Sequence, residues 1–540
     1  MKKKGYSRIL AVIVSLMLLA VIAGGCGNVA KTEPSSSATG AASTEPAAES
    51  GATQAATEKA GPDISKKVTL NAFIMGERPR DMQLVNDELN KMTLKDLNCD
   101  VKFEFSTWTD FQTKYNLILT SGQDLDLIYT ALWLDYPKYA KVGAYMALDD
   151  LLPEVTPDLY QSMSEDAWKS AKIKGKIYTV PADYDEYNTK GMTYREDLRK
   201  RYDLPEIKDL DTMRQYLEGI HKNDPKILPT ATNYCMAFQD AIFPNYDFPT
   251  GPVGGGQSYA FLYMHPVGKF TELSSMMDDP GFIQEFKMIK EWADAGCWSR
   301  SVLSYKGQPS NDVSSGAAAA ALDNQPAKHK GVVESVASSH PDWEIGYFSY
   351  ADIGEAVHPN PASFNGMAVP KSSKNPERAL LFMEKLHLDK EYYFITNYGI
   401  KGAHYDLNDK GEYKSLLASD KNGFNMGSMQ PWGWNNTKLT LNVENGWNDG
   451  WVAINKHLGE KGTPGYDLLF SMDPTPVQSE IAALSQVMTQ YFGPLSAGLV
   501  PDVDKAMATL KEKMNAAGYE KYAAEFKKQY LEFCSEYGLQ

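Results

Sequence analysis

The stretch that decides the fold runs from residue 66 to residue 133: "KKVTLNAFIMGERPRDMQLVNDELNKMTLKDLNCDVKFEFSTWTDFQTKYNLILTSGQDLDLIYTALW". Its first ten residues alternate between apolar and polar, as a half-buried strand does. The stretch predicts three strands, at 66–75, 100–108 and 124–133, separated by two helices, at 80–98 and 110–123. Strands and helices that alternate at this spacing indicate a parallel α/β sheet with right-handed crossovers.

Ligands of such sheets collect outside the carboxyl ends of the strands. The residues that directly follow the three predicted strands are therefore candidate ligand contacts: Glu77 and Arg78 after the first, Trp108 after the second and Trp133 after the third. For each of them the alternative is an ordinary loop or packing residue.

The first 65 residues have the composition of a targeting segment and a linker. Basic residues at 2–4 and 8 precede an apolar run, 9–23, and small residues then precede Cys26, which predicts a signal peptide over 1–25. The cysteine after small residues resembles a lipobox, so we expect a lipid on Cys26; the alternative is an ordinary signal peptide cut nearby. Residues 26–65 are rich in Ala, Ser, Thr, Glu and Pro and predict a disordered tether.

Composition and motifs exclude several functions. The 540 residues carry a formal net charge of −15, which argues against nucleic acid as a partner. No G-x-S-x-G, H-E-x-x-H or Walker motif occurs, so we expect no enzyme, no cofactor and no metal site. Residues 406–413 resemble the start of a calcium loop, but Leu417 stands where the bidentate Glu is needed, and we expect a turn. The five cysteines have no metal spacing; we expect buried thiols, and one disulfide remains open.

A second stretch, "MQPWGWNNTKLTLNVENGWNDGWVAIN" at 429–455, places Trp432, Trp434, Trp447 and Trp451 among Gly, Asn and Asp. An indole laid on the apolar face of a sugar ring buries carbon surface, while polar neighbours pair the hydroxyls on its rim. We therefore predict that these tryptophans line a carbohydrate cleft. The alternative is that they fill the core or pin turns.

Seven segments occur in an order that resembles the extracellular solute-binding lipoproteins of ABC importers. They are "YNLILTSGQDLDLIYTALW", "YPKYAKVGAYMALDDLLPE", "AWKSAKIKGKIYTVPA", "YREDL", "NGMAVPKSSKNPERALLFMEKL", "NYGIKGAHYDL" and "AAGYEKYAAEFKKQYLEF", spread over residues 115–533. The nearest resemblance is to the group described as aldouronate or complex-polysaccharide transport binding proteins, which has an extra C-terminal domain of uncharacterised role.

The resemblance implies an α/β, two-lobe periplasmic-binding-protein (Venus-flytrap) fold with hinge crossovers and a helical C-terminus. Lobe 1 would comprise 66–188 and 367–445, and lobe 2, with the C-terminal helical region, 189–366 and 446–540. Crossovers are expected near 184–192, 362–368 and 430–455. Tyr184 and Asn365 lie at the first two and are candidate ligand contacts.

The resemblance also implies the function. We expect a monomeric receptor, lipid-anchored at the outer face of the cytoplasmic membrane, that closes on a sugar or oligosaccharide and delivers it to ABC permease subunits. In a Gram-positive organism this is the cell surface, and in a Gram-negative one the periplasmic side. A ligand-sensing protein for a membrane signalling system and a receptor for a non-carbohydrate solute remain alternatives. An aldouronate would need a cation in the cleft, for which Arg78 and Arg80 are candidates.

Overall fold

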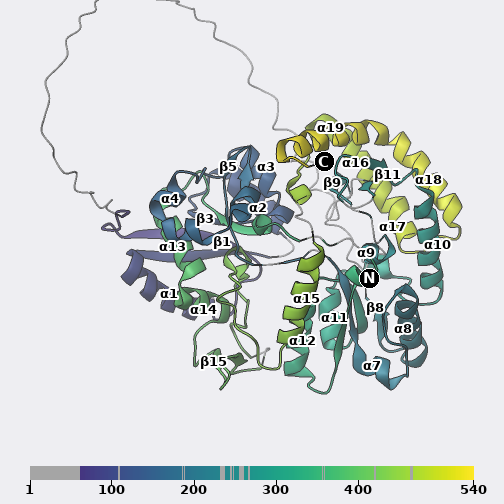
Figure 1. The fold of residues 1–540 in the computed structure, drawn as a ribbon, viewed down its shortest axis with the longest axis horizontal. Coiled ribbons are helices and arrows are strands. Elements are labelled where there is room, and N and C mark those ends of the chain that lie inside the picture. Colours follow the sequence, from purple (N-terminus) through teal and green to yellow (C-terminus); the bar gives the residue numbers. More distant parts are fainter. Residues whose placement is uncertain are drawn as a thin grey trace, which may run out of the picture. The chain divides into compact units, whose positions relative to one another are not determined.

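The computed structural model describes a compact unit that starts at Gly61 (Figure 1). The described residues are 61–107, 110–184, 186–187, 189–231, 238–243, 246, 248–253, 261–265, 268–354, 357, 359–418, 421–462 and 466–539. The predicted signal peptide, Cys26, the tether up to residue 60 and Trp108 lie outside them.

The predicted N-terminal sheet is present. It has five strands in the order β2 (Cys99–Ser106), β1 (Val68–Met75), β3 (Leu127–Ala131), β14 (Asn365–Ala368) and β6 (Val180–Pro181). β1 pairs in parallel with β2 and with β3, as the sequence predicts. β14 and β6 were not predicted as members of this sheet; β14 runs antiparallel to β3 and to β6.

Helices pack against this sheet, and their apolar side chains form a buried core together with those of the strands. The two predicted ones are α1 (Met82–Leu97) and α2 (Phe111–Ser121). Two consecutive helices, α13 (Pro376–Leu388) and α14 (Lys390–Tyr398), join them. Asp389 ends one helix and caps the next, because its carboxylate accepts a hydrogen bond from the Glu391 amide at 3.0 Å. Shorter elements complete the layer: η1 (Leu132–Leu134), α3 (Tyr136–Lys141), α4 (Leu151–Val155), α5 (Pro157–Ser162), α6 (Glu165–Ser170), β4 (Lys172–Ile173) and β5 (Lys176–Ile177).

A second sheet has four strands in the order β13 (Ile345–Ser349), β7 (Gly191–Arg195), β12 (Ala318–Asn324) and β8 (Leu228–Thr230). β12 is the alanine-rich segment, and residues 318–322 are fully buried, because small side chains let neighbouring elements approach both faces of the strand. The helices of this part are α7 (Glu196–Arg201), α8 (Leu210–Asn223), α9 (Gln239–Ile242), α10 (Pro280–Asp294), α11 (Pro309–Ser315) and α12 (Pro326–Ser339). Its short strands are β9 (Thr250–Val253), β10 (Leu262–Met264) and β11 (Leu273–Ser275).

The chain passes between the two sheets at two connections, 182–190 and 350–364. It leaves the first sheet after β6, enters the second at β7, and returns from β13 to β14 through η4 (Tyr350–Asp352) and η5 (Ala362–Phe364). A later segment contains β15 (Tyr405–Leu407), β16 (Tyr413–Ser415) and η6 (Pro431–Trp434), and leads into α15 (Asn448–Lys461). Buried apolar residues form one large cluster around each sheet.

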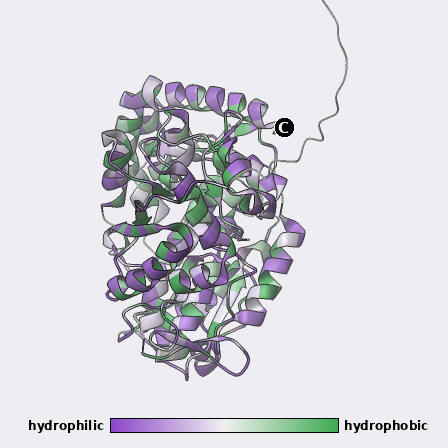
Figure 2. Ribbon diagram, turned by 90° about the vertical axis from the view of Figure 1, so that its left-hand side faces the viewer, coloured by the Kyte–Doolittle hydropathy of each residue, from purple (hydrophilic) through white to green (hydrophobic). Residues whose placement is uncertain are grey.

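The C-terminal region is helical, as predicted. It comprises η7 (Tyr466–Leu469), η8 (Thr475–Val477), α16 (Gln478–Val487), the π-helical turn η9 (Met488–Phe492), α17 (Gly493–Ser496), α18 (Val503–Ala516) and α19 (Tyr519–Tyr537). Its apolar stripes pack on the second cluster through residues such as Leu484, Leu510 and Phe526. The helices alternate hydrophilic and hydrophobic segments, which is typical of helices with one buried face (Figure 2).

Among the described residues, no helix is both long enough and apolar enough to cross a bilayer.

Candidate ligand-binding site

A cavity of about 540 Å³ lies where the two sheets and the crossovers meet. This volume falls within the roughly 300–1,000 Å³ of most small-molecule sites. Both parts of the fold contribute to its lining, which consists of Trp133, Ala182, Tyr184, Glu186, Gln325, Ala327, Lys328, Asn360, Pro361, Ala362, Phe364, Asn365, Trp432 and Asn435.

The indoles of Trp133 and Trp432 form one side of the cavity, which we call the aromatic wall. Their ring centroids lie 6.4 Å apart with the planes at 72°. Behind them the buried Tyr129 ring contacts both, at 5.9 Å from Trp133 and 6.4 Å from Trp432. Trp133 is 37% exposed although large aromatic side chains are usually covered, so its carbon surface is available to a ligand.

Trp133 reaches the cavity because β3 ends at Ala131 and the chain turns at once into η1. The register of the sheet places Asn365, the first residue of β14, opposite Ala131. The Asn365 side-chain oxygen accepts hydrogen bonds from the Trp133 indole nitrogen at 3.4 Å and from the Tyr129 hydroxyl. These two donors fix the orientation of the Asn365 amide at the cavity edge.

Trp432 is positioned by a close backbone contact. η6 lies directly on β14, and a Cβ on Gly433 would stand 2.8 Å from the carbonyl oxygen of Gly366. Only glycine fits there, so the turn is held against the strand. The loop after β1 is fixed in a similar way, because a Cβ on Gly76, at φ +97°, would meet the Gln430 side chain at 2.6 Å.

The lining of the cavity also includes charged and amide groups. Glu186 and Asn360, which we call the polar edge, belong to the two crossovers, and the Asn360 amide donates to the Glu186 carbonyl at 2.8 Å through the backbone. Burial raises the pKa of the Glu186 carboxyl to about 7, while the Asn360 side chain and the Lys328 ammonium act in the opposite direction. Lys328 also lies 3.9 Å from Asp323.

Tyr184 lines the cavity and is supported from behind by Trp451. The two rings are stacked, with centroids 5.9 Å apart and planes at 23°. Burial raises the pKa of the Tyr184 hydroxyl above its ordinary value, so the group is a neutral hydrogen-bonding phenol at physiological pH. Trp451, one of the predicted contacts, therefore acts as a backing residue and does not itself line this cavity.

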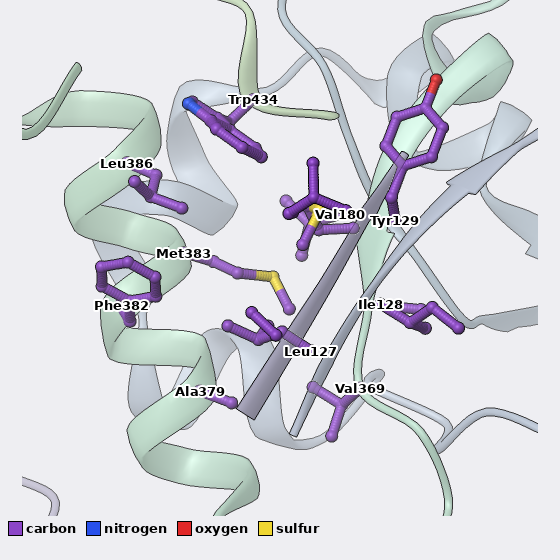
Figure 3. Close-up of a cluster of buried hydrophobic side chains, with 14 of the residues drawn as sticks. Leu127, Ile128, Tyr129, Val180, Val369, Ala379, Phe382, Met383, Leu386 and Trp434 are labelled. Carbon is purple, nitrogen blue, oxygen red and sulfur yellow. The ribbon is translucent and has the colours of Figure 1, made fainter. Parts of the chain in front are cut away.

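Trp434 contradicts the prediction. It is fully buried in the cluster around the first sheet, and its indole nitrogen donates to the Thr396 hydroxyl at 3.1 Å. Figure 3 shows it beside Leu386 and above Met383 and Val180. Neighbouring positions in η6 point in different directions, so Trp432 faces the cavity while Trp434 fills the core.

Three further predicted contacts also fall outside the lining. Trp447 packs against His329 and Tyr347, at 4.4 and 5.8 Å between centroids, near the second sheet. Glu77 and Arg78 are exposed on the loop after β1, where Arg78 lies 5.9 Å from the Phe105 ring. None of the three lines the cavity: Trp447 packs near the second sheet, and the loop that carries Glu77 and Arg78 packs on Gln430.

Of the ten predicted contacts, the cavity thus brings together Trp133, Tyr184, Asn365 and Trp432. Sequence reasoning missed Glu186, Asn360 and Lys328. Glu186 lies in the predicted crossover at 184–192, two residues after Tyr184, so its position in the chain was a usable signal. Asn360 and Lys328 had none, because their burial depends on how the second crossover and α12 pack.

Two other expectations concern metals and thiols. Among the described residues, no group of three or more His, Cys, Asp or Glu side chains could hold a metal ion. Residues 408–412 form a turn in which the Asn408 side-chain oxygen accepts from the amides of Lys410 and Glu412, each at 3.0 Å. Cys99, Cys297 and Cys534 are buried free thiols, as predicted, and Cys235, the fourth predicted one, lies outside the described residues.

A family model described as "Bacterial extracellular solute-binding protein" matches residues 87–396, more than half of the chain. The chain therefore belongs to this family of two-lobe solute-binding proteins, which confirms the resemblance and the predicted fold. A second model, "Domain of unknown function (DUF3502)", matches residues 468–535, the helical C-terminal region.

Individual relatives agree with this assignment. The chain is similar to a carbohydrate ABC transporter substrate-binding protein of Streptococcus pneumoniae, at 25% identity over 486 residues, covering 88% of this chain and 93% of the relative. It is also similar to lipoprotein LipO of Bacillus subtilis, at 23% identity over 376 residues, covering 64% and 68%.

Among solved structures, the fold matches an N-glycan transport solute binding protein of Streptococcus pneumoniae. The TM-score is 0.72 at 21% identity, over 87% of this chain and 99% of that chain. The same protein in complex with Man1GlcNAc gives a TM-score of 0.66.

Proposed function

We propose that this protein is the carbohydrate-binding component of an ABC importer and that its ligand occupies the cavity beside the aromatic wall. The observation that carries the proposal is the pairing of two indoles, Trp133 and Trp432, with the amide side chains of Asn360, Asn365 and Asn435 in one cavity. Sugars need both kinds of surface, because a pyranose has apolar C–H faces and a rim of hydroxyls.

The expected energies suit a transport receptor. An indole that covers one sugar face buries roughly 100 Å², worth about 2–3 kcal/mol at ~25 cal/mol per Å². Hydroxyls on the rim lose their hydrogen bonds to water and must recover them from the amides and the carboxylate of the lining. A cavity with only aromatic walls would leave these hydroxyls unmet, and one with only polar walls would compete poorly with water.

The relatives support this proposal by what they are named for. One is a carbohydrate ABC transporter substrate-binding protein, and the structural neighbour was crystallised with Man1GlcNAc. We also propose, from the resemblance to receptors of ABC importers, that permease subunits recognise the closed, ligand-bound form. We propose that the protein acts as a monomer. The sequence around Cys26 and the similarity to lipoprotein LipO support lipid attachment at the outer face of the cytoplasmic membrane.

Binding can be tested on the chain from residue 27 onward, because the compact unit starts at Gly61. Titration calorimetry and thermal shift with xylan, mannan, glucan, pectin and N-glycan fragments should show stabilisation by at least one class, since a ligand that binds only the folded state raises its melting temperature. If no fragment binds, the carbohydrate proposal is wrong.

The anchor needs a separate experiment. The full chain, expressed in a bacterium and fed a labelled fatty acid, should carry label and partition into detergent, whereas Cys26→Ser should carry none and be released. Two or three acyl chains give stable attachment at roughly 0.8 kcal/mol per buried CH₂. Label on both proteins would mean that the lipid is attached at another residue. Label on neither would mean that the protein is not lipidated.

A further inference from the structure

We infer that the polar edge, Glu186 and Asn360, selects an uncharged sugar by hydrogen bonding two adjacent ring hydroxyls, and that it excludes uronic acids. This inference rests on the proposed function and states which class of carbohydrate the same cavity takes. It departs from the aldouronate-type ligand that the sequence resemblance suggested.

The first observation is the Asn360 side chain. Its nitrogen and its oxygen are both buried and make no hydrogen bond of full geometry to the described residues, although the side chain lies close enough to the Glu186 carboxyl to lower its pKa. A buried amide without partners costs free energy, so native proteins rarely keep one unless something else pairs it. The residue lines the cavity, so a ligand toward which this side chain turns can supply both partners.

An amide offers a donor and an acceptor side by side. Two hydroxyls on neighbouring carbons of a sugar ring match this arrangement, because one can accept from the nitrogen while the other donates to the oxygen. The Asn360 side chain therefore fits a vicinal diol held with its ring face toward the aromatic wall.

The second observation is the charge balance at this edge. The groups around Glu186 are the Lys328 ammonium, the Asn360 amide, and the phenols of Tyr129 and Tyr184. Lys328 is already shared with Asp323 at 3.9 Å. Among the described residues, the lining thus contains one carboxyl, of Glu186, one partly compensated cation, of Lys328, and no arginine.

A uronate placed here would bring a second negative charge toward Glu186, and Lys328, the one cation of the described lining, would then have to compensate both carboxylates as well as Asp323. Like charges at close range in a poorly solvated site repel strongly. Arg78, the cation suggested for such a ligand, lies on the exposed loop after β1 and does not line the cavity, and neither does Arg80. A neutral hydroxyl, in contrast, can donate to the Glu186 carboxylate.

The test uses matched ligand pairs on the chain from residue 27: xylotriose with glucuronosyl-xylotriose, and galactobiose with digalacturonate, alongside neutral manno- and gluco-oligosaccharides. Calorimetry at pH 7.5 should find the tightest binding to a neutral member, with its acidic counterpart at least about tenfold weaker. Asn360→Ala should weaken the neutral ligand by about 10- to 100-fold, since two hydrogen bonds are lost.

Glu186→Gln provides the second arm. It should narrow the gap between the neutral and acidic members, because the repelling charge is gone. The affinity of the wild-type protein for the neutral ligand should fall below pH 7, where the carboxyl, with its pKa raised to about 7, takes up a proton, and the variant should lack this pH dependence.

Matched controls are Glu77→Gln, which removes the same charge on an exposed loop, and Asn223→Ala on the outer face of α8. Neither should alter affinity. If the wild-type protein binds a carbohydrate but prefers the uronate, or if Asn360→Ala binds as tightly as wild type, the inference is wrong while the proposed function stands. If no carbohydrate binds at all, both fall together.

Discussion

The core under η6 and the wall of the cavity are built by neighbouring residues, but they treat polar groups in opposite ways. In the core, the Trp434 indole nitrogen is paired with Thr396 at 3.1 Å, and the Asn436 amide donates to the His387 carbonyl at 2.8 Å. At the cavity, both polar atoms of the Asn360 side chain lack partners among the described residues, and the Glu186 carboxyl is poorly solvated.

This difference separates residues that hold the fold from residues reserved for a ligand. A polar group in a folded core is usually paired within the protein, because leaving it unpaired costs about 1–3 kcal/mol. His387 is an exception, since neither of its buried ring nitrogens has a hydrogen-bond partner among the described residues. A binding site carries that cost until the ligand arrives. Trp432 and Trp434 are two residues apart on one turn, yet Trp432 lines the cavity and Trp434 is part of the core.

The largest expected effect is on the core. Trp434→Ala should lower the free energy of unfolding by about 3–5 kcal/mol, because it leaves a cavity among α13, β3 and β6. Trp432→Ala should cost about 1–2 kcal/mol, since its ring is only half-buried. Urea unfolding followed by circular dichroism measures both free energies of unfolding. Equal losses for the two variants would mean that Trp432 and Trp434 contribute alike to the core.

The next effect concerns the Glu186 carboxyl and pH. Its folded-state pKa of about 7 lies above the ordinary 4.5, so the folded protein holds more protons than the unfolded chain between these values. Stability should therefore fall as pH rises through this window, by up to about 3 kcal/mol at pH 8.

Glu186→Gln has no proton to lose and should not show this fall. The measurement is urea unfolding at pH 5 and pH 8 of the wild type, of Glu186→Gln and of Glu77→Gln. The Glu77→Gln variant shows how much of the pH effect comes from the loss of any carboxylate. The same pH dependence in all three proteins would mean that Glu186 titrates as an exposed carboxyl.

The aromatic wall should matter for binding more than for folding. Trp133→Ala and Trp432→Ala should each weaken carbohydrate binding by about 2 kcal/mol, close to 30-fold, because each removes a flat apolar surface. Calorimetry with the tightest neutral oligosaccharide measures this. Trp133→Phe and Trp432→Phe should keep part of the affinity that the Ala variants lose. This result would not be expected if the indoles acted only through their N–H groups.

The smallest effect tests the polar groups directly. Thr396→Val should cost about 1 kcal/mol, because it leaves the Trp434 nitrogen unpaired. Asn360→Leu should leave the stability of the free protein unchanged or raise it, because it removes two unmet polar atoms. Thermal unfolding without ligand measures both, and a large loss for Asn360→Leu would show that this amide serves the fold.

Much of the fold was predictable, because it follows from local patterns. The alternation in β1 and the helical spacing of α1 and α2 are visible in any short window, and the order of strands and helices then gives the parallel pairing. The antiparallel β14 could not be foreseen as a member of the first sheet, because its pairing with β3 joins residues more than 230 positions apart. The domain boundaries proposed from the sequence stay a prediction.

The site was predictable only where a strand end or a crossover marks it. Trp133 and Asn365 follow or begin strands that meet at one edge, and Tyr184 and Trp432 lie beside crossovers. Nothing in the sequence distinguishes Trp432 from Trp434, because the direction of each ring depends on how η6 lies on β14. That they contact a ligand also stays a prediction.

Backbone touches backbone where Gly433 meets Gly366, so the indole of Trp432 is carried on the strand itself and has little freedom to shift. A protein engineer who wants a sugar sensor of altered selectivity would gain little by redesigning that half of the cavity. The residues around Asn360 and Lys328 come from a crossover and from the start of a helix, where side chains can be exchanged without disturbing a sheet. The surface that packs on one face of the sugar ring is therefore rigid, whereas the side chains that contact its rim of hydroxyls can be exchanged.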